Sequence, residues 1–268
     1  MLDSWALKLA PEPFRDFLPY TSVSALKVIH TRQVLRRALD IAQHTGDHGA
    51  RAREASRLEQ SLEQSALSSE IALVGSVGSG LSAATLDDAD RRVIGERVLK
   101  LYFHQLFGDG PLFLDLRPRH FSWDANRRKL NFFPSSLWCA PDPEFMARLR
   151  SLYAGFYRDD RAALARGVEL YGWQCSPTAG FEARIERLLR GHFGSSGEVR
   201  FLISHFRATF DAIFAEVAES QAKLHPDLTF LGVELVGLYL TLESLSVPLD
   251  ARAAFEQVCR DPGRVPEP

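Results

Sequence analysis

Apolar side chains recur every three or four residues along most of this chain, which is the spacing that gives an α-helix one buried face. In the first part of the sequence this spacing predicts helices over residues 31–44 and 50–69, with Gly46 and Gly49 in the turn between them. In the second half it predicts six further helices, over residues 142–157, 159–171, 180–192, 198–223, 226–245 and 251–260. The pattern therefore indicates a mainly α-helical protein whose C-terminal half is a helical bundle.

The middle of the chain is less regular. Residues 71–74 form a short apolar run that is typical of a strand, and a linker rich in glycine and serine follows. A helix is predicted over residues 87–107, because the acidic side chains at its start suit the positive end of a helix dipole. Two short segments, 120–123 and 129–133, then form a hairpin-like pair. The expected fold class is therefore mainly α (α+β).

Composition narrows the function classes. The chain has 268 residues, of which 46% are hydrophobic and 25% are charged, as in ordinary soluble globular proteins. Its formal net charge of -2 provides no global attraction to nucleic acid or to an anionic membrane. We therefore expect no nucleic-acid partner.

Targeting and redox features favour the cytoplasm. The three cysteines are odd in number and widely spaced, which argues against both a disulfide framework and a zinc knuckle. The first fourteen residues have acidic and proline interruptions where a secretory signal would have a basic start and an apolar core. The apolar stretch over residues 228–248 is broken by Glu234 and Glu243, so no transmembrane span is predicted.

The segment around Asp115 has the layout of a kinase catalytic loop. A helix ends at Gly108, a short apolar run leads to Asp115, and the hairpin-like pair follows. In a kinase, such an Asp accepts the proton of the attacking hydroxyl, an Asn five residues later holds a metal ion, and a second Asp holds the bridging metal. Here His120 stands at the Asn position and Pro134 lies closest to the second Asp. Mg²⁺ requires hard oxygen ligands, so the sequence predicts a kinase-like loop without its metal site.

Taken together with the later helices, residues 91–258 resemble the C-terminal lobe of the UbiB/AarF/ADCK family of atypical kinases. Three segments carry this resemblance: ERVLKLYFHQLFGDG, which is similar to the helix before the family's HADPHPGN loop, FYRDDRAALARGVELYGW, and LHPDLTFLGVELVGLYLTLESLSVPLD. The resemblance implies a protein-kinase-like fold with a helical C-lobe and a reduced, mostly helical N-terminal lobe. The implied organisation is an N-terminal lobe over residues 1–86, a C-lobe over 87–260 and a flexible tail over 261–268.

The same resemblance implies that the catalytic motifs are degenerate. The HADPHPGN loop falls on residues 113–120, where only Asp115 and Pro118 match. The family's Asp-Phe-Gly metal motif falls on residues 134–136, which lack the carboxylate, and its KxGQ helix and Ala-rich nucleotide loop are not found in residues 1–90.

Several residues remain candidates for binding or catalysis. Asp115 and His120 are a candidate catalytic remnant, although a turn-capping Asp and a packed loop His are the alternative interpretations. Arg117 and Arg119 are candidates for binding an anion, because guanidinium groups grip phosphate or carboxylate in a forked geometry. Lys27 is a further candidate, because the segment around it has the look of a strand that presents a phosphate-pairing lysine.

Residues 71–82 imitate a phosphate-binding loop. Their sequence, IALVGSVGSGLS, has a strand followed by two correctly spaced glycines. Leu81 occupies the position of the essential lysine, so a lobe linker is the preferred interpretation.

The function expected from these features is that of a pseudokinase, a catalytically degenerate accessory that binds or scaffolds a protein partner. The resemblance places such a role in isoprenoid quinone or lipid metabolism and leaves room for peripheral membrane contact. No metal or cofactor is expected. A divergent ATP- and magnesium-dependent phosphotransferase that uses Asp115 and His120 is the first alternative, and a helical lipid-binding protein is the second.

Overall fold

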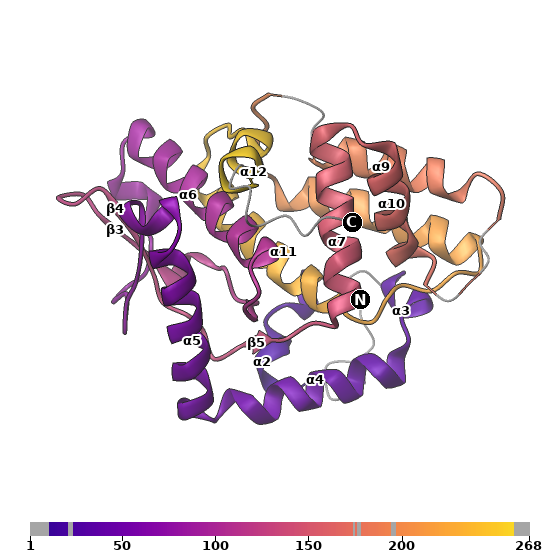
Figure 1. The fold of residues 1–268 in the computed structure, drawn as a ribbon, viewed down its shortest axis with the longest axis horizontal. Helices are drawn as coiled ribbons and strands as arrows, with labels where there is room; N and C mark the ends of the chain where they lie inside the picture. Colours follow the sequence, from indigo (N-terminus) through magenta and orange to yellow (C-terminus); the bar gives the residue numbers. More distant parts are fainter. Residues whose placement is uncertain (1–10, 21–23, 174, 176–177, 194–196, 260–268) are drawn as a thin grey trace. The chain divides into compact units, whose positions relative to one another are not determined.

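The computed structural model describes residues 11–20, 24–173, 175, 178–193 and 197–259 (Figure 1). Contacts divide the chain into two units, each built from separate stretches of sequence. Unit 1 comprises Met1–Gln43, Pro141–Ser195 and Ile203–Val233, and unit 2 comprises His44–Ala140, Ser196–Leu202 and Glu234–Pro268. The predicted boundary between residues 86 and 87 falls inside unit 2, and the predicted tail lies outside the described residues.

Helices hold most of the described residues, so the prediction of a mainly α protein is confirmed. Unit 1 contains the following elements: α2 (Glu12–Arg15), α3 (Ala25–Val28), most of α4 (Thr31–Thr45), α7 (Pro143–Arg158), α8 (Arg161–Val168), α9 (Phe181–Phe193), α10 (Ile203–Glu219) and the start of α11 (Leu228–Leu245). Unit 2 contains α5 (His48–Glu63), β1 (Ile71–Leu73), α6 (Asp88–Phe107), β2 (Leu112–Phe113), β3 (Phe121–Asp124), β4 (Lys129–Phe132), β5 (Trp138–Cys139), the rest of α11 and α12 (Ala251–Cys259).

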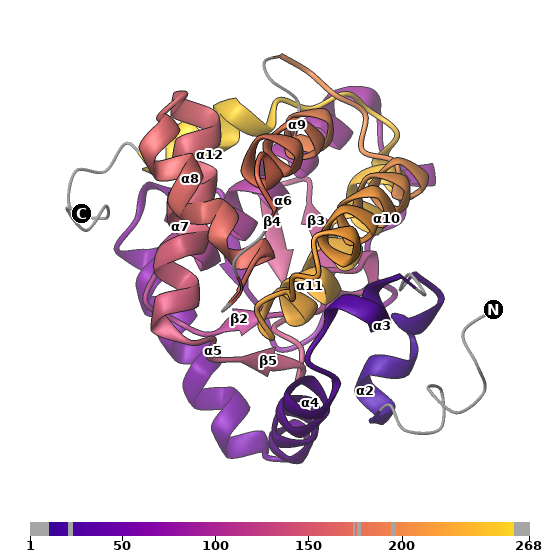
Figure 2. The ribbon, with the colours of Figure 1, turned by 90° about the vertical axis from the view of Figure 1, so that its right-hand side faces the viewer.

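Unit 1 has its tightest packing between α7 and α8, which lie side by side in Figure 2. A Cβ atom on Gly155 of α7 would lie 2.3 Å from the backbone nitrogen of Leu164 on α8. Reciprocally, a Cβ atom on Gly167 of α8 would lie 2.4 Å from the Cα atom of Leu152 on α7. The two helix backbones therefore touch, and glycine is required at both positions because any side chain would force them apart.

Unit 2 is organised around α6. The helix begins at the predicted acidic start, where Asp87 caps it by accepting a hydrogen bond from the Asp90 amide. From Ile94 onward most of its side chains are buried, and α12 packs along it (Figure 1). Because α6 is enclosed on several sides, its sequence has no single apolar stripe. The extent of this helix is marked in the sequence by the residues at its two ends.

The strands of unit 2 form two small sheets. The predicted hairpin is confirmed, because β3 pairs antiparallel with β4. On its other edge β4 pairs in parallel with β1, and Leu73 lies opposite Phe132 at the carboxyl ends of the two strands. A separate antiparallel pair joins β2 to β5. The carboxyl ends of β1 and β4 and the beginning of β3 therefore lie at one edge of the three-stranded sheet.

Several predicted boundaries were wrong. The helix predicted over residues 50–69 ends at Glu63 and is followed by a short 3₁₀ turn, Ala66–Ser69. The helix predicted from residue 198 begins only at Ile203, because Val199 forms an isolated bridge with Leu249 through two backbone hydrogen bonds. In the second case a strand-like contact replaced part of the periodic pattern.

Among the described residues, one helix is long and apolar enough to cross a membrane by length and composition. This helix is α11, whose mean hydropathy is 1.5, and 67% of it is buried inside the protein. Most of this helix therefore lies inside the protein.

Candidate functional site

The candidate site is the loop between β2 and β3, which belongs entirely to unit 2. Its entry is fixed by two hydrogen bonds: the Phe113 amide donates to Oε1 of the buried Gln105 at 2.9 Å, and the Leu114 amide donates to the Leu137 carbonyl at 2.9 Å. The loop ends in a 3₁₀ turn, Pro118–His120, that leads directly into β3. These bonds deliver Asp115 into the interior, where 2% of the residue is exposed.

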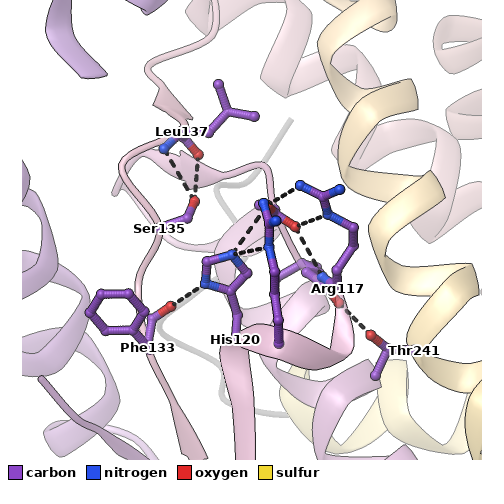
Figure 3. Close-up of polar contacts among 9 residues, drawn as sticks. Arg117, His120, Phe133, Ser135, Leu137 and Thr241 are labelled. Atoms are coloured by element: carbon purple, nitrogen blue, oxygen red, sulfur yellow. Dashed lines mark hydrogen bonds and ion pairs between the residues drawn. The ribbon is translucent and has the colours of Figure 1, made fainter. Parts of the chain in front are cut away.

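The Asp115 carboxylate is surrounded by cationic and ring nitrogens from its own loop, including those of Arg117 and His120, which are labelled in Figure 3. Arg117 donates through Nε to Oδ1 at 2.8 Å and through Nη2 to Oδ2 at 2.7 Å, in a bidentate pair. Arg119 donates through Nη2 to Oδ2 at 2.7 Å. His120 lies with Nε2 3.1 Å from Oδ2, and the Arg117 amide donates to Oδ1 at 3.2 Å. Both carboxylate oxygens therefore already have several donors.

This environment lowers the pKa of Asp115 far below its ordinary value. Burial alone would raise the pKa, but the hydrogen bonds from Arg117 and His120 and the charges of the same side chains stabilise the ionised form more strongly. An efficient general base has a pKa close to the operating pH. The Asp115 carboxylate is therefore a weak proton acceptor, and its arrangement is that of a structural ion-pair centre.

His120 is packed as well as hydrogen-bonded. Its Nδ1 lies 3.1 Å from the carbonyl oxygen of Phe133, and its ring stacks on the Phe133 ring with centroids 5.9 Å apart (Figure 3). The Phe133 amide in turn donates to the His120 carbonyl at 2.8 Å. These contacts fasten the loop to the end of β4, which is the packed role that the sequence left open for this histidine.

Helix α11 supports the site from the other side of the loop, and the sequence did not predict this contact. Thr241 donates from Oγ1 to the carbonyl oxygen of Leu116 at 2.6 Å (Figure 3). One turn earlier, a Cβ atom on Gly237 would lie 2.8 Å from the Leu116 amide nitrogen. The glycine thus lets the helix backbone reach the loop, and the threonine satisfies a carbonyl that would otherwise be buried without a donor.

Residues 134–136, which stand at the position of the kinase metal motif, are held by local hydrogen bonds. Ser135 is buried, donates from Oγ to the Leu137 carbonyl at 3.0 Å and accepts from the Leu137 amide at 3.2 Å. Within the described part of the chain, no three His, Cys, Asp or Glu side chains lie close enough together to hold a metal ion. The donors around Asp115 are cations, and they do not fit a divalent metal.

The structure brings together four of the five predicted site residues, Asp115, Arg117, Arg119 and His120. Lys27 belongs to unit 1, where it lies exposed on α3. The interpretation of its surroundings as a strand was wrong, because residues 25–28 form a helical turn. The carbonyl oxygen of Lys27 accepts a hydrogen bond from the Lys223 ammonium group, which ties this turn to the segment after α10.

Glu234 is a buried acid. In the sequence it is seen only as an interruption of the apolar stretch over residues 228–248. It lies on α11 one turn before Gly237, and it is 0% exposed. Within the described residues, neither of its carboxylate oxygens has a hydrogen-bond donor. Burial raises the pKa of this carboxyl well above its ordinary value, so the neutral acid is the favoured form in the folded protein.

Replacing Glu234 with Gln is expected to remove the part of the pH dependence of the free energy of unfolding that this carboxyl causes above pH 4.5. Above the ordinary pKa of 4.5, the unfolded chain releases this proton while the folded protein holds it, so wild-type stability falls as pH rises towards the folded pKa. Gln has no proton to lose. Urea unfolding at pH 4.5 and pH 7 should show the gap between the two proteins widening with pH. Glu63→Gln, at an exposed position on α5, is the control and should behave as wild type.

The sequence as a whole was also compared with known proteins. No family model matches the chain, and the comparison with curated proteins found no match. The UbiB/AarF/ADCK resemblance therefore rests on the three sequence segments that suggested it.

Proposed function

We propose that this protein is a kinase-like binding module without phosphotransfer activity, a pseudokinase of UbiB/AarF type that supports a protein partner. The observation that carries this proposal is the state of Asp115. Its carboxylate is buried and accepts hydrogen bonds from Arg117 and Arg119, with His120 at 3.1 Å. A residue used in this way stabilises a loop and is not available to a substrate hydroxyl or a metal ion.

The order of elements around the loop supports the kinase-like part of the proposal. A long helix, α6, leads through the short strand β2 into the Asp115 loop, and the hairpin β3–β4 follows. This is the order from which the kinase catalytic-loop layout was inferred. A family resemblance of this kind supports a fold, whereas an activity depends on the residues of the site.

The site argues against catalysis on energetic grounds. Phosphoryl transfer depends on positive charge and metal ions aimed at the transferred group, and losing a single group of this kind typically costs about 10²–10³ in rate. Here His120 and Pro134 stand at both metal-ligand positions. The loop cations are already directed at the protein's own carboxylate, so they do not replace the metal.

The partner and the setting are inferred from the resemblance. We infer a cytoplasmic protein that assists an enzyme of isoprenoid quinone or lipid metabolism, through protein contact and peripheral membrane contact. The mostly buried α11 and the three free cysteines are compatible with such a setting.

The test is a thermal-shift titration with ATP, with and without Mg²⁺ or Mn²⁺. The proposal predicts that adding the metal gives no stabilisation beyond that of ATP alone, because no metal-bridged nucleotide complex forms. A saturable, metal-dependent rise in Tm would contradict it. Such a rise, together with phosphate release that is lost in a folded Asp115→Asn variant, would establish the divergent phosphotransferase instead.

A further inference from the structure

We propose that the glycine-rich turn over residues 75–80, together with Arg119, forms a binding site for the phosphate group of a small soluble phosphomonoester. The sequence motif in this turn resembles a phosphate loop but lacks its lysine. The structure supplies a cation from another part of the chain. The proposal needs neither a metal ion nor phosphotransfer, so it stands apart from the function proposed above.

The turn and the Asp115 loop meet at one edge of the sheet. The turn leaves the carboxyl end of β1, Phe133 follows the carboxyl end of β4, and the 3₁₀ turn Pro118–His120 leads into β3 at the same edge. Ligands of open α/β sheets bind outside the carboxyl ends of parallel strands, because the loops that follow those strands converge there. The small sheet of unit 2 has this arrangement at β1 and β4.

Direct contacts join the glycine-rich turn to the loop that carries Arg119. The Leu81 amide donates to the Pro118 carbonyl at 2.9 Å. A Cβ atom on Gly80 would lie only 2.7 Å from the Arg119 Cα atom, so the glycine permits the two backbones to touch. Leu81, at the lysine position of the motif, is thereby attached to the segment that carries Arg119.

The turn presents backbone donors to solvent. Gly75, Ser76, Gly78 and Ser79 are exposed, and Gly78 and Gly80 have positive φ angles of 62° and 78°. Within the described part of the chain, no carbonyl or side chain accepts a hydrogen bond from the amides of residues 75–79. Successive amides in a turn of this kind form a concave set of donors that favours an anion.

The charge next to the turn is positive. Two guanidinium groups, of Arg117 and Arg119, face the single carboxylate of Asp115, so the cluster has an excess of positive charge. The Arg117 side chain is 14% exposed, whereas that of Arg119 is 57% exposed. Arg119 donates through Nη2 to Asp115 and through Nε to His120, so its contribution to a ligand at the turn is the positive charge of its exposed side chain.

These features select a phosphate group among anions. A phosphate dianion offers several acceptor oxygens to the amides and a double negative charge to the nearby guanidinium group, whereas a simple carboxylate offers fewer acceptors and one charge. The site is open to solvent, so the expected affinity is modest and requires no enclosed pocket. The rest of the ligand would lie outside the protein.

The test is an NMR titration of ¹⁵N-labelled full-length protein with inorganic phosphate at constant ionic strength, with acetate as the comparison anion. We expect saturable shifts of the amides of Gly75, Ser76, Gly78 and Ser79 with phosphate, and weaker effects with acetate. Arg119→Ala should raise the dissociation constant at least about fivefold, because a charge-assisted contact is lost. Arg127→Ala, which removes an equally charged side chain that is 82% exposed, is the matched control and should leave the constant unchanged.

Absence of shifts in the turn amides of the wild type would overturn the proposal without reliance on any variant. Equal effects of Arg119→Ala and Arg127→Ala would also overturn it, since they would indicate a general charge effect. Phosphate binding that persists without a metal would leave the pseudokinase proposal standing. A metal-dependent ATP complex would contradict the pseudokinase proposal, and the absence of phosphate-induced shifts would separately contradict the phosphate site.

Discussion

Replacing Asp115 with Ala is expected to lower the free energy of unfolding by about 3–5 kcal/mol, the cost of removing one partner of a buried ion pair. The Arg117 side chain is only 14% exposed and would lose its bidentate partner. Arg119 and His120 would lose the same acceptor. A loss of this size is a large fraction of the stability of a typical domain, and urea unfolding followed by circular dichroism would measure it.

Asp88→Ala is the matched control for this prediction. Asp88 also faces an arginine, Arg91, at 3.4 Å, but its side chain is 85% exposed. An exposed pair contributes less than about 1 kcal/mol, so the control should change stability little. If Asp115→Ala were no more destabilising than Asp88→Ala, Asp115 would not be the structural centre of its loop.

Replacing Gly237 with Ala should lower the free energy of unfolding by about 1–3 kcal/mol, through overpacking. The added methyl carbon would lie 2.8 Å from the Leu116 amide nitrogen, so α11 or the loop must move. That movement would lengthen the hydrogen bond from Thr241 to the Leu116 carbonyl. The same urea experiment would detect the loss.

Gly232 provides a control within the same helix. A Cβ atom at Gly232 meets nothing within 4 Å, so the only effect of Gly232→Ala is the better helix propensity of alanine. This variant should be more stable than wild type by up to about 1 kcal/mol. The two substitutions in α11 should therefore change the free energy of unfolding in opposite directions. Equal changes would show that α11 does not pack against the Leu116 loop.

Helices with clear end signals could be predicted from the sequence. The helix predicted over residues 87–107 is α6 almost to the residue, because Asp87 caps one end and Gly108 follows the other. The hairpin was also predicted, over residues 120–123 and 129–133, and its strands lie at 121–124 and 129–132. The short turn α3 was not, because four residues are too few for a period to be detected.

The composition of the site could be predicted, but its internal chemistry could not. The sequence singled out Asp115, Arg117, Arg119 and His120 because they are close together in the chain. Whether these cations point outward to an anion or inward to the carboxylate depends on backbone geometry, which the 3₁₀ turn determines. The contributions of Gly237 and Thr241 come from about 125 residues away, and no local pattern signals a contact of that kind.

The central claim is that the Asp115 carboxylate is an ionised structural group whose oxygens are already occupied. A ¹³C NMR titration of the Asp115 side-chain carboxyl, with and without Mg²⁺, tests it most directly. The lowered pKa means that the stability contributed by this group is present above its unfolded pKa, about 4, and is lost only as pH falls towards the folded value. We predict that the carboxyl stays ionised at every pH at which the protein is folded, and that its resonance does not move when Mg²⁺ is added. Proton uptake near neutral pH, or a saturable Mg²⁺-dependent shift, would contradict the account.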